Sequence, residues 1–163
     1  MASGQSLFYI DPRSIVPDVS GADVEYSSIA PYAPYVAFDC TLTEAGTFPC
    51  WMPSHYTGGS GIKMIFWHAN ATVAGVAQYK INFNAFITSA SVGDTTYDTT
   101  IVACLSAPSA DDRTFTTITI PDAATDSIAA GFPFTVLLRR DANNAATEAS
   151  ADSQIFGIYL EEV

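Results

Sequence analysis

Two histidines, His55 and His68, are the side chains of this chain best suited to general-base or metal chemistry. A hydrolase triad needs a nucleophile beside a base and an orienting acid, but the sequence contains no G-x-S-x-G turn. His55 follows Pro53 and Ser54 in a predicted loop, whereas His68 ends a predicted strand. We therefore expect two ordinary structural histidines rather than a catalytic dyad or a pair of metal ligands.

The segment Gly58-Gly59-Ser60-Gly61 has the glycine content of a phosphate-binding loop. Such a loop continues with Lys and Ser or Thr and opens a helix, and neither feature follows here. The segment is therefore predicted to be a turn.

Paired carboxylates are a second kind of candidate, because two acids across a groove can hydrolyse a glycosidic bond. The pairs available by spacing are Asp39 with Glu44, and Asp94 with Asp98. Asp39 stands within the apolar run Phe38–Cys40, where an acid must be paired or face solvent. Neither pair carries a recognisable acid–base signature, so we expect no catalytic residues and no enzyme.

A polar stretch from Arg139 to Asp152 follows a predicted strand. Calcium binds the oxygens of acidic and amide side chains, and the stretch contains four of these: Asp141, Asn143, Glu148 and Asp152. They lack the spacing and the glycine of an EF-hand. We favour a structural role, in which Arg140 pairs with Asp141 or with Asp152. A subunit contact and a calcium site are the alternatives.

The three cysteines, Cys40, Cys50 and Cys104, are an odd number without paired spacing. This pattern disfavours a disulfide framework and a four-ligand zinc site. Free cysteine is often buried, so we expect small apolar residues within a sheet. Whether Cys40 and Cys50 face each other across a hairpin stays open. No cofactor and no metal is expected.

Charge and length exclude several classes of protein. The chain has 163 residues, with six basic and seventeen acidic side chains and a net charge of −11. Such a chain repels phosphate backbones, so we expect no nucleic-acid partner. The densest apolar run, Ile62–Ala69, is too short to span a membrane. The first residues lack the basic and apolar regions of a secretory signal, so we expect the chain to be made and folded in a cytoplasm.

Short apolar runs separated by Gly, Pro, Asp and Ser clusters predict an all-β fold. In Val76–Ile87, apolar and polar residues alternate with a period of two, which excludes a helical face. Eight strands are predicted in all: Tyr35–Cys40, Gly46–Met52, Ile62–His68, Val76–Ile87, Tyr97–Leu105, Thr114–Ile120, Phe132–Arg140 and Gln154–Glu161.

The strands define two regions of the chain. Residues 1–34 contain four prolines and are predicted to be an extended N-terminal arm with a short strand at Ser6–Ile10. Residues 35–163 are predicted to form an eight-stranded, two-sheet sandwich of the jelly-roll type. An immunoglobulin-like sandwich is the alternative, although its Cys–Trp–Cys spacing is missing. Asp122–Ala130 is the best candidate for a short helix.

Three segments of the chain carry recognisable motifs. Residues 38–59 contain F-D-x-x-x-x-E followed by P-x-x-Y-x-G-G, and residues 62–79 form a predicted strand pair with an aromatic residue at each end. Residues 138–142 with Asp152 and the final strand follow the pattern R-D-A … D … I-x-E. In these three segments the chain resembles β-sandwich virion proteins of tailed bacteriophages, although Glu148 stands where an aspartate is usual in that group.

The resemblance implies a structural role in a virus particle rather than a reaction. The leading hypothesis is a capsid decoration protein that binds the major capsid protein as a homotrimer on the capsid surface. Binding only the expanded shell would stabilise that shell by mass action. The arm, residues 1–34, would make the capsid or inter-subunit contact.

The alternative hypothesis is a receptor- or carbohydrate-binding jelly-roll module of a phage tail or fibre. Exposed aromatic rings would then stack on sugars, and the candidates are Trp51, Trp67, Tyr56 and Tyr97. Alternation within Ile62–His68 favours the core for Trp67. A small polysaccharide depolymerase is a third, less favoured hypothesis.

Overall fold

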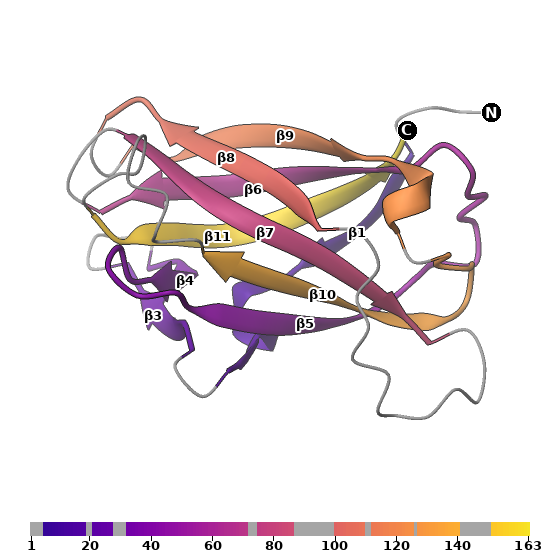
Figure 1. Cartoon of the computed structure of the whole chain (residues 1–163), viewed down its shortest axis with the longest axis horizontal. Helices are drawn as coiled ribbons and strands as arrows, with labels where there is room; N and C mark the ends of the chain where they lie inside the picture. Colours follow the sequence, from indigo (N-terminus) through magenta and orange to yellow (C-terminus); the bar gives the residue numbers. More distant parts are fainter. Residues whose placement is uncertain are drawn as a thin grey trace.

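Alternating apolar residues place one face of each strand against a second layer. In the computed structural model these faces meet between two antiparallel sheets (Figure 1). The structure describes residues 5–18, 21–27, 32–71, 75–86, 100–109, 112–125, 127–140 and 151–163. No helix in these ranges is long and apolar enough to cross a membrane.

The two sheets contain all eight predicted strands. The six-stranded sheet has the order β3 (Asp23–Tyr26), β4 (Pro34–Phe38), β11 (Ser153–Glu162), β6 (Ile62–Asn70) and β9 (Thr114–Ile120), and β1 (Ser6–Ile10) also pairs with β11. The five-stranded sheet has the order β2 (Val16–Pro17), β5 (Ala45–Trp51), β10 (Pro133–Arg140), β7 (Gly75–Ala85) and β8 (Ile101–Ala107). The predicted all-β, two-sheet sandwich is thus confirmed.

The N-terminal region lies along the sheets of its own chain. Strand β1, expected from the sequence, pairs with β11, and β2 and β3 extend the edges next to β5 and β4. A 3-10 turn, η1 (Pro12–Ser14), connects β1 to β2. Leu7, Ile10 and Ile15 from this region are buried in the main core. Removing residues 1–34 would therefore take side chains out of the core and would not affect the surface alone.

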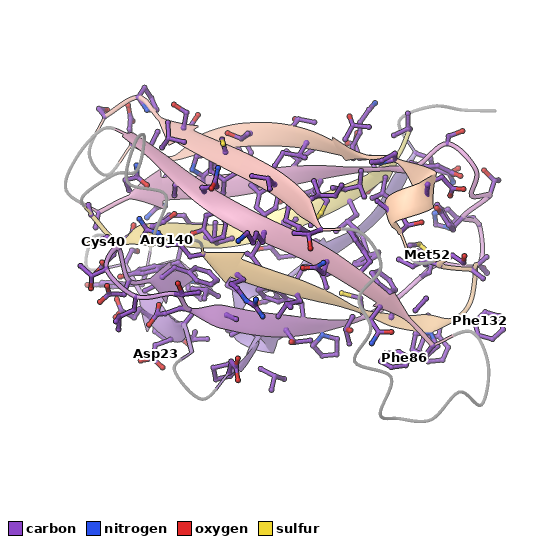
Figure 2. All side chains as sticks on the ribbon, viewed as in Figure 1. Asp23, Cys40, Met52, Phe86, Phe132 and Arg140 are labelled. Atoms are coloured by element: carbon purple, nitrogen blue, oxygen red, sulfur yellow. The ribbon has the colours of Figure 1, made fainter. Side chains whose placement is uncertain are left out.

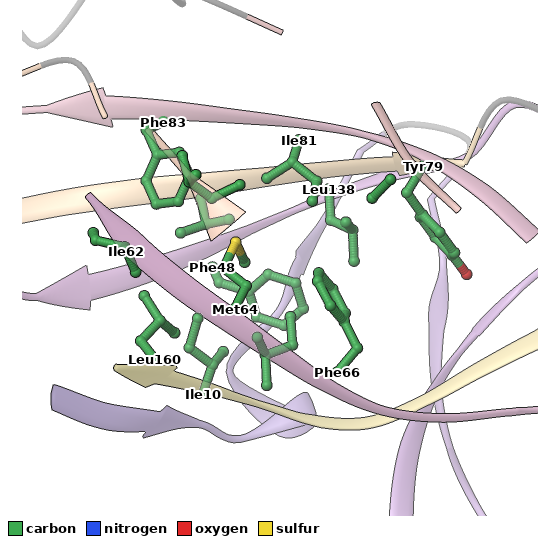
Figure 3. Packing of buried hydrophobic residues seen from close by; sticks show 14 of the residues in the cluster. Ile10, Phe48, Ile62, Met64, Phe66, Tyr79, Ile81, Phe83, Leu138 and Leu160 are labelled. Carbon is green, nitrogen blue, oxygen red and sulfur yellow. The ribbon is translucent and has the colours of Figure 1, made fainter. Parts of the chain in front are cut away.

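The core fills the space between the sheets (Figure 3). The face of β7 predicted from alternation contributes Ala77, Tyr79, Ile81 and Phe83, each at most 1% exposed. Strand β6 faces them with three fully buried side chains, Ile62, Met64 and Phe66. Burial of such side chains contributes about 1.5–3 kcal/mol each. Ile87, expected on the same face of β7, lies outside the described residues.

A bulge in β11 fixes the position of β1. The register between β11 and β6 shifts between Ile155 and Gly157, which turns the neighbouring Phe156 to the outer face. The ring of Tyr9 in β1 lies directly over Gly157, where a Cβ atom would come within 2.3 Å of it. The Tyr9 hydroxyl donates to the Phe156 carbonyl at 2.9 Å. Glycine at this position therefore allows β1 to lie against β11.

The helix expected at Asp122–Ala130 is reduced to one 3-10 turn, η2 (Asp122–Ala124). The Thr125 hydroxyl donates to the Asp122 carbonyl at 2.7 Å, which competes with helical bonding of the backbone. Ser127 then adopts a φ of 56°, which ends right-handed helical geometry. The sequence signal of weak helical periodicity was outweighed by these local bonds.

The glycine-rich segment is the predicted turn, and it joins β5 to β6. Gly58, Gly59 and Gly61 all have positive φ values, of 72°, 79° and 94°. A Cβ on Gly61 would lie 2.3 Å from the Ile120 carbonyl oxygen, whereas a Cβ on Gly59 would have no atom within 4 Å. A side chain at Gly59 would therefore cause backbone strain alone, whereas a side chain at Gly61 would cause the same strain and a steric clash.

We predict that Gly61→Ala destabilises the fold more than Gly59→Ala. Gly59→Ala costs about 1–2 kcal/mol from its positive φ alone. Gly61→Ala adds overpacking against a fixed backbone, which costs about 1–3 kcal/mol more. Urea unfolding of both variants measures the difference. Equal losses of unfolding free energy would contradict the predicted clash.

Candidate functional site

The carboxylate pair Asp39 and Glu44 lies in the turn between β4 and β5 and bonds to backbone. The Asp39 carboxylate accepts hydrogen bonds from the Thr41 amide and hydroxyl and from the Leu42 amide. Glu44 accepts from the Asp39 amide at 2.7 Å. The hydrogen bonds from Thr41 lower the pKa of Asp39, and burial raises the pKa of Glu44. The two acids stabilise the turn, and Asp94 and Asp98 lie outside the described residues.

A small group of possible ligands forms where this turn meets the start of β11. Asp39, Cys40 and Asp152 each offer a ligand atom, all within 4.8 Å of one another. Asp152 already accepts from the Cys40 amide at 3.0 Å. Burial and the negative charge of Asp152 raise the pKa of the Cys40 thiol, and the positive charge of Arg140 is close enough to act on both Asp39 and Cys40. This charge disfavours a cation there, and the other calcium candidates, Asp141, Asn143 and Glu148, lie outside the described residues.

Arg140 is fully buried at the end of β10, which is unusual for a charged side chain. Figure 2 shows it at the same end of the sandwich as Cys40, opposite the end with Met52 and Phe132. Its guanidinium donates to the Phe38 carbonyl at 2.7 Å and to the Ala151 carbonyl at 3.2 Å. Both of these bonds run to backbone carbonyls, and Asp141, one of the two carboxylate partners predicted from the sequence, lies outside the described residues. Arg140 thereby connects β10 to the end of β4 and the start of β11.

The two histidines do not form a shared site. His55 is exposed in the loop before β6, with its Nε2 3.3 Å from the Ser6 carbonyl oxygen. His68 is fully buried near the far end of β6. It follows Ile62, the first residue of the strand, by six residues, which is about 20 Å at 3.3 Å per residue. Its Nε2 lies 2.8 Å from the Thr116 hydroxyl, and its Nδ1 has no hydrogen-bond partner among the described residues.

The cysteines are all free thiols. Cys40 follows β4 in one sheet and Cys50 belongs to β5 in the other, so they do not pair across a hairpin. Cys50 packs against the core, and burial raises its pKa to about 12. Cys104, in contrast with the expectation of burial, is exposed on β8.

Two of the four aromatic candidates, Tyr56 and Trp67, are wholly or partly covered by other side chains. Tyr56 is 5% exposed and belongs to the core. Tyr97 lies outside the described residues. Alternation placed Trp67 in the core, but this prediction was wrong. Trp67 lies half-buried on the outer face of the six-stranded sheet. The rings of Phe115 and Phe156 pack on it, at 6.2 and 5.2 Å between centroids.

Trp51 is the accessible aromatic candidate. It is 63% exposed at the end of β5, opposite Pro133 of β10 on the outer face of the five-stranded sheet. Beside it is a cleft of about 240 Å³ between β5 and the β1–η1 segment, lined by Phe8, Tyr9, Ile10, Asp11, Ser14, Pro49, Cys50 and Trp51. Small-molecule pockets have volumes of roughly 300–1,000 Å³. The cleft is slightly smaller than these, as expected for a shallow binding site.

Asp11 and Ser14 supply the polar groups of this cleft. Both Asp11 carboxylate oxygens accept hydrogen bonds from the Arg13 guanidinium. These bonds lower the pKa of Asp11 and keep it an ionised acceptor. The Ser14 hydroxyl donates to the Asp11 carbonyl at 2.7 Å and retains acceptor capacity. The sequence did not identify these residues as a site, although the Phe8-Tyr9-Ile10 run next to Asp11 was a signal for an ordered segment.

The chain matches no protein-family model and no curated protein. It does match solved structures of carbohydrate-binding modules. One is the CBM22-1 xylan-binding domain from Paenibacillus barcinonensis Xyn10C, with a TM-score of 0.56 and 9% identity, covering 99% of this chain and 96% of that one. Another is the family 11 module from Clostridium thermocellum in complex with a β-1,3-1,4-mixed-linked tetrasaccharide, with a TM-score of 0.52, 11% identity, and 100% and 98% coverage.

A third match is the K1 cleaved adhesin domain of Lys-gingipain from Porphyromonas gingivalis, with a TM-score of 0.52, 11% identity, and 96% and 90% coverage. These likenesses show that the fold is a jelly-roll sandwich of the kind found in carbohydrate-binding modules. None of the three is described as a virion protein. At 9–11% identity, these likenesses show the fold alone.

We predict that His68 makes the fold sensitive to acid. Burial lowers its folded-state pKa to about 4, whereas an unfolded histidine titrates near 6.5. The unfolded state therefore binds more protons below pH 6.5, and stability falls as the pH drops from 6.5 to 4. The loss reaches about 2–3 kcal/mol near pH 4.

Urea unfolding at pH 7.5 and 4.5 tests this contribution. His68→Gln keeps a polar partner for Thr116 and does not titrate, so it should lose less stability than the wild type between these pH values. His55→Gln, at the exposed histidine, should behave like the wild type. Identical pH dependence in all three proteins would contradict the assignment to His68.

Proposed function

We propose that this protein is a carbohydrate-binding module whose binding surface is centred on Trp51. The observation that carries the proposal is a largely exposed tryptophan beside a cleft, on a jelly-roll sandwich similar to known carbohydrate-binding modules. An indole ring offers a flat apolar surface and one N–H donor. An exposed ring of this size can serve as a contact surface for a sugar.

The polar groups of the cleft favour a neutral sugar. The ionised Asp11 carboxylate accepts hydrogen bonds from hydroxyl groups, and the Arg13 bonds fix its orientation. The chain carries a net charge of −11, so an acidic polysaccharide would be repelled. Recognition would combine stacking on Trp51 with hydrogen bonds to Asp11 and Ser14. No step of bond cleavage is proposed for this site.

We propose a phage tail or fibre as the setting, because the sequence resembles virion proteins of tailed bacteriophages. A capsid decoration protein, bound to the major capsid protein as a homotrimer, is the second candidate, and the motif resemblance and the acidic charge favour it. Immunogold microscopy of phage particles distinguishes the two. We expect gold at the tail tip or fibres, and gold distributed over the head would support capsid decoration instead.

We predict that Trp51→Ala weakens sugar binding at least tenfold, which corresponds to about 1.4 kcal/mol. Affinity electrophoresis first identifies a ligand among soluble polysaccharides, starting with xylan and β-1,3-1,4-mixed-linked glucan. Calorimetry with an oligosaccharide of that polymer then gives the affinity of each site. The wild type should bind, and Trp51→Ala should retain its fold by circular dichroism while it loses affinity.

Phe115→Ala is the matched control for this experiment. Phe115 is 62% exposed, nearly the same as Trp51, but it belongs to β9 in the other sheet. Its replacement should leave the affinity of each site unchanged. An equal loss in both variants would place the binding surface elsewhere, and absence of binding to every polysaccharide would remove the proposal.

A further inference from the structure

The outer edges of the two sheets differ in how they are protected, and β1, which pairs only with β11 among the described residues, adds a further edge. Strands β2 and β3 form the edges on one side, and β8 and β9 lie against each other on the opposite side (Figure 1). An edge strand presents unpaired backbone N–H and C=O groups to any other strand. Proteins therefore shorten such edges or place charges and prolines on them.

Strands β2 and β3 are protected in this way. Strand β2 has only two residues, and the second of them is Pro17, which has no backbone donor. Strand β3 has four residues, and two of these are the acids Asp23 and Glu25. Neither strand is suited to pairing with a further strand.

Strand β9 is the opposite case. Its seven residues, Thr114–Ile120, include no charge, no proline and no glycine, and each one is β-branched or aromatic. Its register with β6 runs without a bulge. Among the described residues β9 pairs with β6 alone, so its other edge faces away from the sheet. Its outward side chains, Phe115, Thr117 and Thr119, are all exposed.

We propose that the β9 edge pairs with β9 of a second copy of this chain, antiparallel and about a two-fold axis at Thr117. Thr117 is the middle residue of the strand, so this register uses all seven residues. Phe115 then lies opposite the partner copy's Thr119, and Thr116 lies opposite its Ile118. Outer side chains meet outer ones and inner side chains meet inner ones, which is the condition for one continuous sheet.

A second copy fits this edge for two reasons. The pairs that the register creates are threonine with threonine, and aromatic or β-branched residues with threonine, which are favourable cross-strand pairs. Although each copy has a charge of −11, no charged residue lies within β9, so no like charges meet across the strands. The same patch on both copies gives a closed, isologous contact, which stops at a dimer.

Strand β8 is a competing edge, because it also lacks charge and proline. It contains Ala103, Ser106 and Ala107, whose β propensity is lower than that of the β9 residues. Self-pairing of β8 about its middle residue would bring two copies of Cys104 together. The exposed native thiol therefore reports on the β8 edge, and an introduced thiol can report on β9.

The dimer would have a functional consequence under the proposed sugar-binding role. Each copy has its own Trp51 cleft, so two binding sites would be joined in one particle. Joined sites bind a polymer with higher avidity than single ones. The pairing itself does not require that role, and the test below does not use a sugar.

Sedimentation velocity and thiol cross-linking test the pairing on the full chain. The wild type should sediment at twice its mass of 17.3 kDa. Thr117→Lys places two ammonium groups opposite each other and should give a monomer, whereas Leu42→Lys, in the exposed turn after β4, should remain a dimer. In a Cys104→Ser background, Thr117→Cys should form a disulfide-linked dimer with oxidised glutathione.

Thr119→Cys in the same background is the control for the register. Its two copies would be separated by four residues along the strands, about 13 Å, and should not cross-link. A wild-type chain that stays monomeric up to about 100 μM would overturn the proposal. Cross-linking of the wild type through Cys104 would overturn it in favour of the β8 edge, and equal cross-linking of both introduced cysteines would refute the register.

Discussion

The structure depends on the way in which β11 divides one of its edges between two strands. Residues 153–155 pair with β4, and Glu161 to Ile158 pair with β1, while β6 follows the opposite edge of β11. Both partners run antiparallel to β11, and the strand passes from β4 to β1 between Ile155 and Ile158. The bulge before Gly157 lies at this passage and increases the local twist. The other strands of this sheet take their places relative to that point.

The same constraint positions the candidate sugar site. Because Gly157 admits the Tyr9 ring, β1 stays against β11, and Asp11 and η1 follow at a fixed distance from β5. At the C-terminal end of β11, Glu162 accepts hydrogen bonds from Thr57 and Gly58 in the loop before β6. These hydrogen bonds lower the pKa of Glu162. Thus a single strand fixes both the segment that forms one wall of the cleft and the loop that follows β5.

Alternation in the sequence was sufficient to predict the eight long strands, because each has one buried face. It was not sufficient for β2 and β3, which are short and carry Pro17 or acids on exposed positions. Alternation also gives two faces without saying which one is buried, and Trp67 was placed on the wrong one. Lys63 shares that face and was the available clue. The partners of Arg140 could not be predicted for a different reason. Its guanidinium donates to the backbone carbonyls of Phe38 and Ala151, and every residue type supplies such a carbonyl.

The central position of β11 also has a consequence for the order of folding. Strands β1, β4 and β6 all precede β11 in the sequence, yet each needs it as a neighbour in the sheet. During synthesis these strands leave the ribosome with an edge that has no partner until the last strand is made. Non-local pairing of this kind is slow, and exposed edges are prone to misassembly while they wait. We expect the six-stranded sheet to form only after synthesis of β11, so nascent chains of this protein depend on protection from aggregation.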